Sequence, residues 1–298
     1  MEKIKYTMWK TLSLLAFMFF LESCNEPDNG SDELERIQII AETIESSDVN
    51  APDFWSDTEI VWRDEFDGNS LSDEKWLPEV FFDGVFNTEL QSYTAENIEV
   101  SGGTLKLNVE KVGEGQNPGD YTSARLNSKF AFQYGRLEFR AKLPAQKGNG
   151  LWVKLWMLGN NIETVGYPEC GEITFMKYVS HIPGEYSSTA NTAENAQGGE
   201  NPSNSPQVLI DTAEEEFHVY GVLWTDEYLR FYVDNINNVT FTFNRPENPN
   251  RSNWPFSEPF YYGFDIAVGG EFGGAEGVDD SIFPTFMELD YVRVYHPR

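Results

Sequence analysis

The stretch Leu137-Glu-Phe-Arg-Ala-Lys-Leu143 alternates apolar and charged side chains with a period of two residues. That spacing places the apolar side chains on one face of a β-strand and the charged ones on the other. Residues 105–109 (Leu-Lys-Leu-Asn-Val) alternate in the same way, and β-rich runs recur at 60–62, 217–224, 228–233, 260–268 and 286–295. Because clusters of Gly, Pro, Asn and Ser separate these runs, the sequence predicts one all-β domain over residues 58–298, a sandwich or a barrel.

The amino-acid composition excludes several classes of function. The chain has 298 residues, of which 21 are Lys or Arg and 49 are Asp or Glu, so its formal net charge is −28. Since phosphate binding needs a basic surface, this charge argues against a nucleic-acid partner. The 22 Phe, 14 Tyr and 8 Trp residues suit β-strands and can also stack on sugar rings. Two cysteines cannot form a disulfide scaffold, and three dispersed histidines do not match a catalytic zinc site.

The first 57 residues predict export and anchoring rather than a folded domain. Lysines precede an apolar run over residues 11–21, which is shorter than the about 20 residues of a transmembrane helix and suits a signal peptide. The run ends in Leu21-Glu-Ser-Cys24, which resembles the lipobox of bacterial lipoproteins. That resemblance implies a signal peptide over 1–23 and a lipid on Cys24. An ordinary signal peptide with an incidental cysteine is the alternative.

Residues 24–57 predict the lipidated cysteine and an acidic tether, with helical spacing of apolar residues over 34–44. An acidic run directly after the lipidated cysteine resembles the export tag of surface lipoproteins in glycan-degrading Gram-negative bacteria. We therefore expect the protein in the outer membrane, exposed at the cell surface and held there through its lipid alone. The other cysteine, Cys170, is expected to be a small core residue rather than a nucleophile.

One strand has a polar pattern that suggests chemistry. In Glu172-Ile-Thr-Phe-Met-Lys177, residues 172 and 174 share one face of a strand, while Ile173 and Phe175 face the core. Lys177 joins the polar face only if one extra residue bulges out before it. Taken alone, the pattern favours an amphipathic strand with a solvated polar face, so the flanking motifs decide its meaning.

Those motifs resemble glycoside hydrolase family 16, especially its laminarinase-type β-1,3-glucanases, over nearly all of 58–298. The matching stretches, in the family's order, are Trp62-Arg-Asp-Glu-Phe-Asp-Gly68, Asn87-Thr-Glu-Leu-Gln-Ser-Tyr-Thr94, Tyr121-Thr-Ser-Ala-Arg-Leu126, Tyr134-Gly-Arg-Leu-Glu-Phe-Arg-Ala-Lys-Leu-Pro144, Gly150-Leu-Trp-Val-Lys-Leu-Trp-Met-Leu-Gly159, Phe217-His-Val-Tyr-Gly221, Ala267-Val-Gly-Gly270 and Leu289-Asp-Tyr-Val-Arg-Val-Tyr295. The resemblance implies a β-jelly-roll of two curved antiparallel sheets, the concanavalin A-like fold, with a glycan cleft on its concave face.

The catalytic strand of the family reads Glu-x-Asp-x-x-Glu, with the nucleophile first and the general acid/base last. A retaining glycosidase needs these two carboxyl groups about 5–5.5 Å apart, one to attack and one to protonate the leaving oxygen. Here Glu172 keeps the nucleophile position, Thr174 replaces the Asp and Lys177 replaces the acid/base. Since general acid–base catalysis contributes about 10²- to 10⁴-fold, the resemblance implies a homologue that has lost hydrolysis.

The resemblance also implies binding residues. The sugar-stacking and polar positions of the family match Asn87, Arg125, Trp152, Trp156, Tyr167 and Asn191. A Trp buried in the sandwich core is the alternative for Trp152 and for Trp156. Lys154 lies between these two tryptophans where the family has a small residue, so two lysines would enter the cleft. No cofactor is required, but the structural calcium ion of the family would match Glu65, Gly103 and Asp290, largely through backbone oxygens.

We expect the protein to bind a β-glucan such as laminarin without cleaving it, for use by partner glycanases and importers. One alternative is an active endo-acting β-1,3-glucanase that uses another carboxyl group as its acid, with Glu163, Glu169 and Glu185 as candidates. Another is a binder of sulfated or uronic-acid glycans, in which Lys154 and Lys177 form a cationic pocket. The net charge opposes an anionic polymer, although salt screens it beyond about 8–10 Å.

Overall fold

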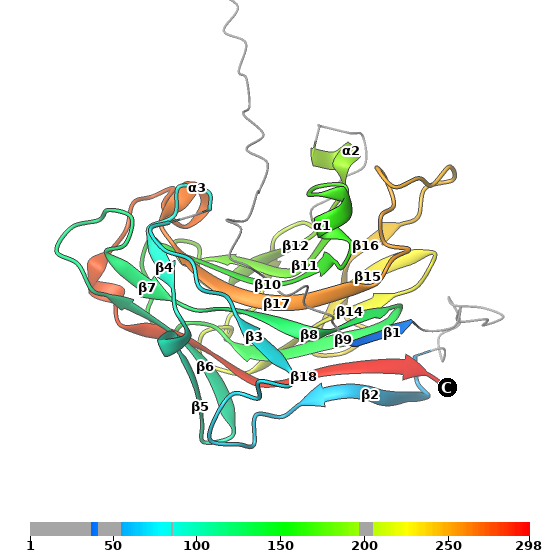
Figure 1. Cartoon of the computed structure of the whole chain (residues 1–298), viewed down its shortest axis with the longest axis horizontal. Helices are drawn as coiled ribbons and strands as arrows, with labels where there is room; N and C mark the ends of the chain where they lie inside the picture. Colours follow the sequence, from blue (N-terminus) through cyan, green and yellow to red (C-terminus); the bar gives the residue numbers. More distant parts are fainter. Residues whose placement is uncertain (1–36, 41–54, 85, 197–204) are drawn as a thin grey trace, which may run out of the picture.

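The structure, a computed structural model, describes residues 37–40, 55–84, 86–196 and 205–298. Two β-sheets stack face to face (Figure 1). One has eight strands: β1 (Ile37–Ile40), β3 (Trp76–Pro78), β8 (Arg125–Gln133), β10 (Leu151–Gly159), β11 (Glu172–Val179), β12 (Glu185–Asn191), β13 (Val208–Leu209) and β17 (Phe260–Val268). The other has ten: β2 (Thr58–Asp64), β4 (Gln91–Tyr93), β5 (Ile98–Ser101), β6 (Thr104–Lys111), β7 (Tyr121–Ser123), β9 (Gly135–Lys142), β14 (His218–Trp224), β15 (Tyr228–Val233), β16 (Val239–Asn244) and β18 (Thr285–Pro297).

Helices are short and lie in the connections between strands. They are α1 (Ile162–Val165), α2 (Ala193–Ala196), α3 (Gly270–Gly273) and the 3-10 turns η1 (Ala95–Asn97) and η2 (Asp280–Ile282). Figure 1 shows α3 beyond one end of the eight-stranded sheet and α1 and α2 beyond the other. The predicted all-β jelly-roll of two sheets is confirmed.

The alternation that predicted the strands is also the pattern of burial. Leu137, Phe139 and Ala141 of β9 are fully buried, whereas Arg136 and Arg140 on the other face are partly exposed; Glu138, on that same face, is 8% exposed. Strand β9 pairs with β14 on one side and with β18 on the other, so it lies in the middle of the ten-stranded sheet. The stretch 137–143 therefore places the centre of the core.

Aromatic side chains join the two sheets across that core. The Phe139 ring of β9 meets the rings of Phe175, Tyr262 and Phe264, which belong to β11 and β17 of the opposite sheet, at centroid distances of 5.0, 6.1 and 6.0 Å. All three contacts are T-shaped, an arrangement that aromatic pairs favour. Burial of these rings fixes how the eight-stranded sheet lies on its partner.

Strand β1 corrects an expectation. The spacing over 34–44 predicted a helix, but Ile37–Ile40 form a strand that pairs in parallel with residues 130–133 of β8. Unpaired strand edges have strong hydrogen-bonding capacity, and here the edge of β8 overrides the local spacing. The predicted signal peptide, Cys24 and most of the predicted tether lie outside the described residues. No helix within the described residues has the length and apolar character to cross a membrane.

We predict that Phe139→Ala lowers the free energy of unfolding by about 3–5 kcal/mol, because it leaves a cavity between the sheets and removes three ring contacts. Urea denaturation followed by tryptophan fluorescence measures this change. Phe286→Ala is the matched control, since Phe286 of β18 is 39% exposed and its loss should cost only about 0.5 kcal/mol. Equal losses in the two variants would contradict the assigned core.

Candidate active site

Polar residues gather on the outward face of β10, β11 and β17, which we call the site face. Val153, Leu155 and Met157 of β10 are fully buried in the core between the sheets. Because side chains alternate along a strand, Trp152, Lys154 and Trp156 of the same strand point the other way. The period-two prediction for these three residues is confirmed.

Strand β11 contains the predicted bulge. Its pairing with β12 shifts between Thr174 and Lys177, and its pairing with β10 shifts at the same point. Phe175 and Met176 both point into the core, which leaves Lys177 on the site face directly opposite Lys154. The extra residue thus brings Glu172, Thr174 and Lys177 to one surface, as the sequence predicted.

Glu172 is held by neutral donors and one lysine. Its Oε1 accepts a hydrogen bond of 2.9 Å from the Thr174 hydroxyl, and its Oε2 accepts one of 3.4 Å from the Asn191 amide. The Lys154 Nζ lies 3.9 Å from Oε1. The salt bridge at Glu172 is therefore made by Lys154, the cross-strand neighbour of Lys177.

Lys177 lies in a partly apolar environment. Its ammonium group lies 5.3 Å from the centroid of the Phe272 ring, which belongs to α3. Burial lowers the pKa of Lys177, the Glu172 carboxylate raises it, and the neighbouring Lys154 ammonium lowers it further, with a net decrease. Lys177, which directly follows the bulge, is thus a cation whose charged form is disfavoured.

Neither tryptophan of β10 offers an open face. Trp152 is 6% exposed, with the Phe272 ring 4.5 Å away and the Lys154 ammonium 4.7 Å from its centroid. Trp156 is 2% exposed beneath the Arg125 guanidinium, which lies 4.6 Å from its ring. Both rings face the site side, but other side chains cover them, so sugar stacking there requires these covers to move.

A carboxylate that the sequence analysis missed organises the centre of the site face. Asp265 of β17 lies opposite Lys154 and is 1% exposed. Its Oδ1 accepts hydrogen bonds from Trp156 Nε1 at 2.7 Å and from Arg125 at 3.0 Å. Arg125 also pairs with Glu79. The signal that could have revealed Asp265 was the presence of an acidic residue within the apolar run 260–268.

Asn87 acts through a second missed carboxylate, Glu89. The Asn87 amide donates to Glu89 Oε1 at 3.2 Å, and Gln91 donates to Oε2 at 2.7 Å. Burial raises the pKa of Glu89, the Asp265 carboxylate raises it further, and the amide donors and Lys154 lower it, with a net increase. Glu89 lay within a quoted motif, but nothing in the motif distinguished it from its neighbours.

The remaining predicted residues lie around the site face or away from it. Tyr167, in the connection between β10 and β11, is 48% exposed and is accessible to a ligand. Glu185 lies on β12, six residues (191 − 185) from Asn191, the partner of Glu172, which is about 20 Å along a strand. Glu163 is exposed on α1, and Glu169 lines a cavity beyond the sheet. Cys170 is fully buried, and burial raises the pKa of its thiol to about 12, as expected of a core cysteine.

The predicted calcium ligands lie on the ten-stranded sheet. Gly103 occupies the turn between β5 and β6, Asp290 belongs to β18, and Glu65 follows β2. The Glu65 carboxylate is bound by Arg293 at 2.8 and 2.7 Å, and Arg140 binds Asp290 at 2.5 Å. Guanidinium groups thus occupy both carboxylates, and no cluster of three acidic, Cys or His residues suited to a metal occurs in the described ranges. The side chains do not fit a calcium site, and calcium held by backbone oxygens stays a prediction.

Comparison with known proteins places this geometry in a family. The model of "Glycosyl hydrolases family 16" matches residues 86–280. The chain belongs to this family. A β-glucanase of Rhodothermus marinus is 41% identical over 249 residues, which cover 80% of this chain and 85% of that protein. The crystal structure of a laminarinase from Flavobacterium sp. UMI-01 matches with a TM-score of 0.71 and 40% identity, over 80% of this chain and 100% of the laminarinase.

A more distant relative is named for binding glucan. The β-1,3-glucan-binding protein of Penaeus monodon is 30% identical over 206 residues, which cover 59% of this chain and 54% of that protein. Relatives named for glucan cleavage and a relative named for glucan binding therefore both resemble this chain.

We predict that Lys177→Met stabilises the fold at pH 7, because burial penalises the ammonium form of Lys177. A depressed pKa in the folded state means that the unfolded chain binds more protons between the folded pKa and the unperturbed value of about 10.4, so wild-type stability rises with pH across that interval. The advantage of Lys177→Met should therefore shrink toward pH 10. Urea denaturation at pH 7 and pH 10 measures it.

The exposed Lys147 supplies the control for this comparison. Lys147→Met removes the same charge without touching the site face, so its effect on stability should be small and should vary little with pH. A destabilising Lys177→Met at pH 7 would contradict the assigned environment of Lys177.

Proposed function

We propose that this family 16 member binds a β-1,3-glucan such as laminarin along its site face and does not hydrolyse it. The observation that supports this proposal most strongly is the set of side chains around Glu172. Along β11 its neighbour on this face is Thr174, and its cross-strand partners are Leu158 and Asn191. A retaining mechanism needs a second carboxyl group about 5–5.5 Å away, and these three positions offer none.

The state of the lysines supports the same proposal. Lys154 lies 3.9 Å from the carboxylate that would have to attack, and an ammonium so placed makes that carboxylate a poorer nucleophile. Lys177 has a lowered pKa and could donate a proton, but it brings no carboxylate to activate water in the second step. Loss of this acid–base function alone would cost about 10²- to 10⁴-fold in rate.

The rival is an active endo-glucanase, as the names of several relatives suggest. Two other carboxylates near the site face, Asp265 and Glu89, are candidates for a substitute acid. Asp265 accepts hydrogen bonds from Trp156 and Arg125, and Glu89 accepts two from amides. Glu89 is 2% exposed and Asp265 is 1% exposed, so neither carboxyl group reaches a glycan on the site face without a rearrangement. This favours the binder.

Charge balance on the site face favours a neutral glycan. The positive charges of Lys154, Lys177 and Arg125 are matched there by the negative charges of Glu172, Asp265 and Glu89. Lys154 itself lies beside two of these carboxylates, Glu172 and Asp265. A cationic pocket for a sulfated or uronic-acid glycan would need an excess of positive charge, and the net charge of −28 adds further repulsion.

Accessible aromatic rings provide the stacking surfaces in this proposal. Tyr167 is 48% exposed at one end of β11, and Phe272 is 39% exposed over Trp152 and Lys177. Stacking is worth about 1 kcal/mol per ring by analogy with other aromatic contacts. Two rings with the polar groups between them suit a Kd of about 1 µM to 1 mM.

The cellular role follows from the N-terminal sequence, which lies outside the described residues. The lipobox-like stretch ending at Cys24 and the acidic run after it support a lipid-anchored protein on the outer-membrane surface. In that position the protein would capture glucan chains for neighbouring glycanases and a glycan importer.

We predict that calorimetric titration of the protein with laminarin gives saturable binding, while a long incubation releases no reducing sugar. Lowering the salt concentration should leave the Kd within about twofold, because a neutral polymer has no charge to screen. Release of oligosaccharides would contradict the binder. Tighter binding of carrageenan or alginate than of laminarin at low salt would support the cationic pocket instead.

We predict that Thr174→Asp combined with Lys177→Glu gives measurable laminarin hydrolysis, about 10²-fold or more above the wild type, because it restores the carboxyl pattern on an intact strand. Reducing-sugar release measures the gain, and Lys147→Glu is a control for added negative charge. No gain in a variant that still binds laminarin would mean that the site face differs from a catalytic one at further positions.

A further inference from the structure

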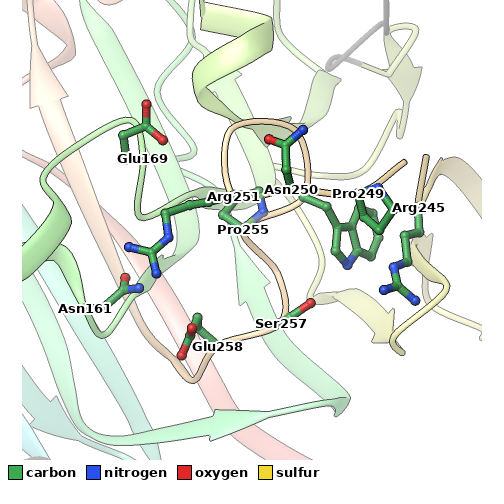
Figure 2. A pocket seen from close by; sticks show the side chains of 10 residues that line it. Asn161, Glu169, Arg245, Pro249, Asn250, Arg251, Pro255, Ser257 and Glu258 are labelled. Atoms are coloured by element: carbon green, nitrogen blue, oxygen red, sulfur yellow. The ribbon is translucent and has the colours of Figure 1, made fainter. Parts of the chain in front are cut away.

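A cavity of about 260 Å³ lies between the β10–β11 and β16–β17 connections, and none of the site-face residues lines it (Figure 2). Asn161 and Glu169, from the connection between β10 and β11, form one wall. The connection between β16 and β17 forms the other, with Arg245, Arg251 and Glu258 among its side chains. Figure 2 shows the Arg251 side chain extending toward Asn161, with Glu169 on one side and Glu258 on the other.

The two walls are fixed to each other. The backbone N–H of Asn160 donates to the Pro259 carbonyl at 2.8 Å and joins the β10–β11 connection to the β16–β17 connection. Gly171 lies against Pro255 so closely that a Cβ at this position would come within 2.5 Å of the proline ring. The cavity is therefore a feature of the packed fold, and its shape does not depend on long side chains alone.

The charged groups of the cavity are not committed to ion pairs. Among the residues that the structure describes, Arg245, Arg251, Glu169 and Glu258 make no salt bridge within 4.0 Å, although two cations and two carboxylates line one small space. Pairs of opposite charge that stand apart around a hollow leave their hydrogen-bonding positions available to a ligand.

Two buried polar atoms in the same walls also lack partners. Asn161 Oδ1 and Trp254 Nε1 have no hydrogen-bond partner within the described ranges, and Trp254 is only 3% exposed. A buried polar atom without a partner costs free energy and calls for an explanation such as a ligand or an ordered water. Both atoms belong to residues that line this cavity.

We propose that this cavity is a distal subsite that binds one sugar unit of a neutral glycan whose chain continues along the site face. The inference rests on the proposed function. Glu169 precedes Glu172 by only three residues (172 − 169), and the exposed Tyr167 lies between Asn161 and Glu169 in the same connection. The cavity therefore shares the β10–β11 connection with Tyr167, directly before the strand that carries Glu172.

The chemistry of the walls selects a neutral sugar. Guanidinium and carboxylate groups have planar, paired hydrogen-bonding positions that match neighbouring hydroxyl groups on a sugar ring. The exposed ring of Pro249 supplies apolar surface for a C–H face of the sugar ring. Two positive and two negative groups leave no excess charge, and the volume is below the about 300–1,000 Å³ of drug-sized pockets.

The test is the dependence of affinity on chain length. The full protein and Arg251→Ala are titrated with laminarin and with β-1,3-linked gluco-oligosaccharides of two to eight units. We expect Arg251→Ala to weaken the long chains about tenfold in Kd, which corresponds to about 1.4 kcal/mol, and to leave the disaccharide unchanged. Asn161→Ala should have the same length-dependent effect.

Arg63→Ala removes the same charge from an exposed position on β2 of the other sheet and should match the wild type at every length. If the wild type binds the long chains and Arg251→Ala binds them equally well, the subsite is wrong and the proposed function stands. If the wild type binds no β-glucan, the proposed function fails and the subsite with it. If Arg251→Ala weakens only the binding of inorganic sulfate or of a sulfated glycan, the cavity is an anion site and the neutral-sugar assignment is overturned.

Discussion

One extra residue in β11 determines what the site face presents. A regular strand would place Lys177 on the core side, where an ammonium group without a partner would be very costly. The bulge buries both Phe175 and Met176 and returns Lys177 to the outer side opposite Lys154. The core thus receives Met176 in place of Lys177, and the surface gains a pair of adjacent cations in the same step.

That pair of cations explains the arrangement of the carboxylates around it. Lys154 lies between β11 and β17 and therefore adjoins both Glu172 and Asp265. Asp265 in turn holds the indole N–H of Trp156 and the guanidinium of Arg125, whose plane covers the Trp156 ring. The result is a surface rich in ionic groups that carries little net charge and presents many hydrogen-bonding positions. Such a surface suits the hydroxyl groups of a neutral glycan.

Much of the architecture was predictable from local patterns. The β-rich runs at 228–233 and 260–268 match the observed limits of β15 and β17, and period-two alternation placed Lys154 between two tryptophans on one face. The sequence also showed that β11 must contain a bulge if Glu172 and Lys177 are to lie on one surface, because only an extra residue could bring them there. These features depend on neighbours along the chain, which the sequence displays directly.

Contacts between distant segments were not predictable. The sequence did not reveal that Phe272 covers Trp152 or that Arg125 covers Trp156, since each pair joins residues far apart in the chain. Arg293 and Arg140 likewise occupy the carboxylates that the family pattern assigned to calcium. Local spacing also failed for Ile37–Ile40, where the open edge of β8 decides the conformation.

Strand β1 has a mechanical consequence. It is the first described element of the chain, and it joins the same sheet that carries the site face, in parallel register with β8. In the proposed surface-anchored state, tension between a captured polymer and the membrane would enter the domain through this strand. Force along a strand loads its ladder hydrogen bonds in shear, so the bonds between β1 and β8 share the load instead of opening one after another. A four-residue strand can in this way transmit drag from the polymer directly into the sheet that holds it.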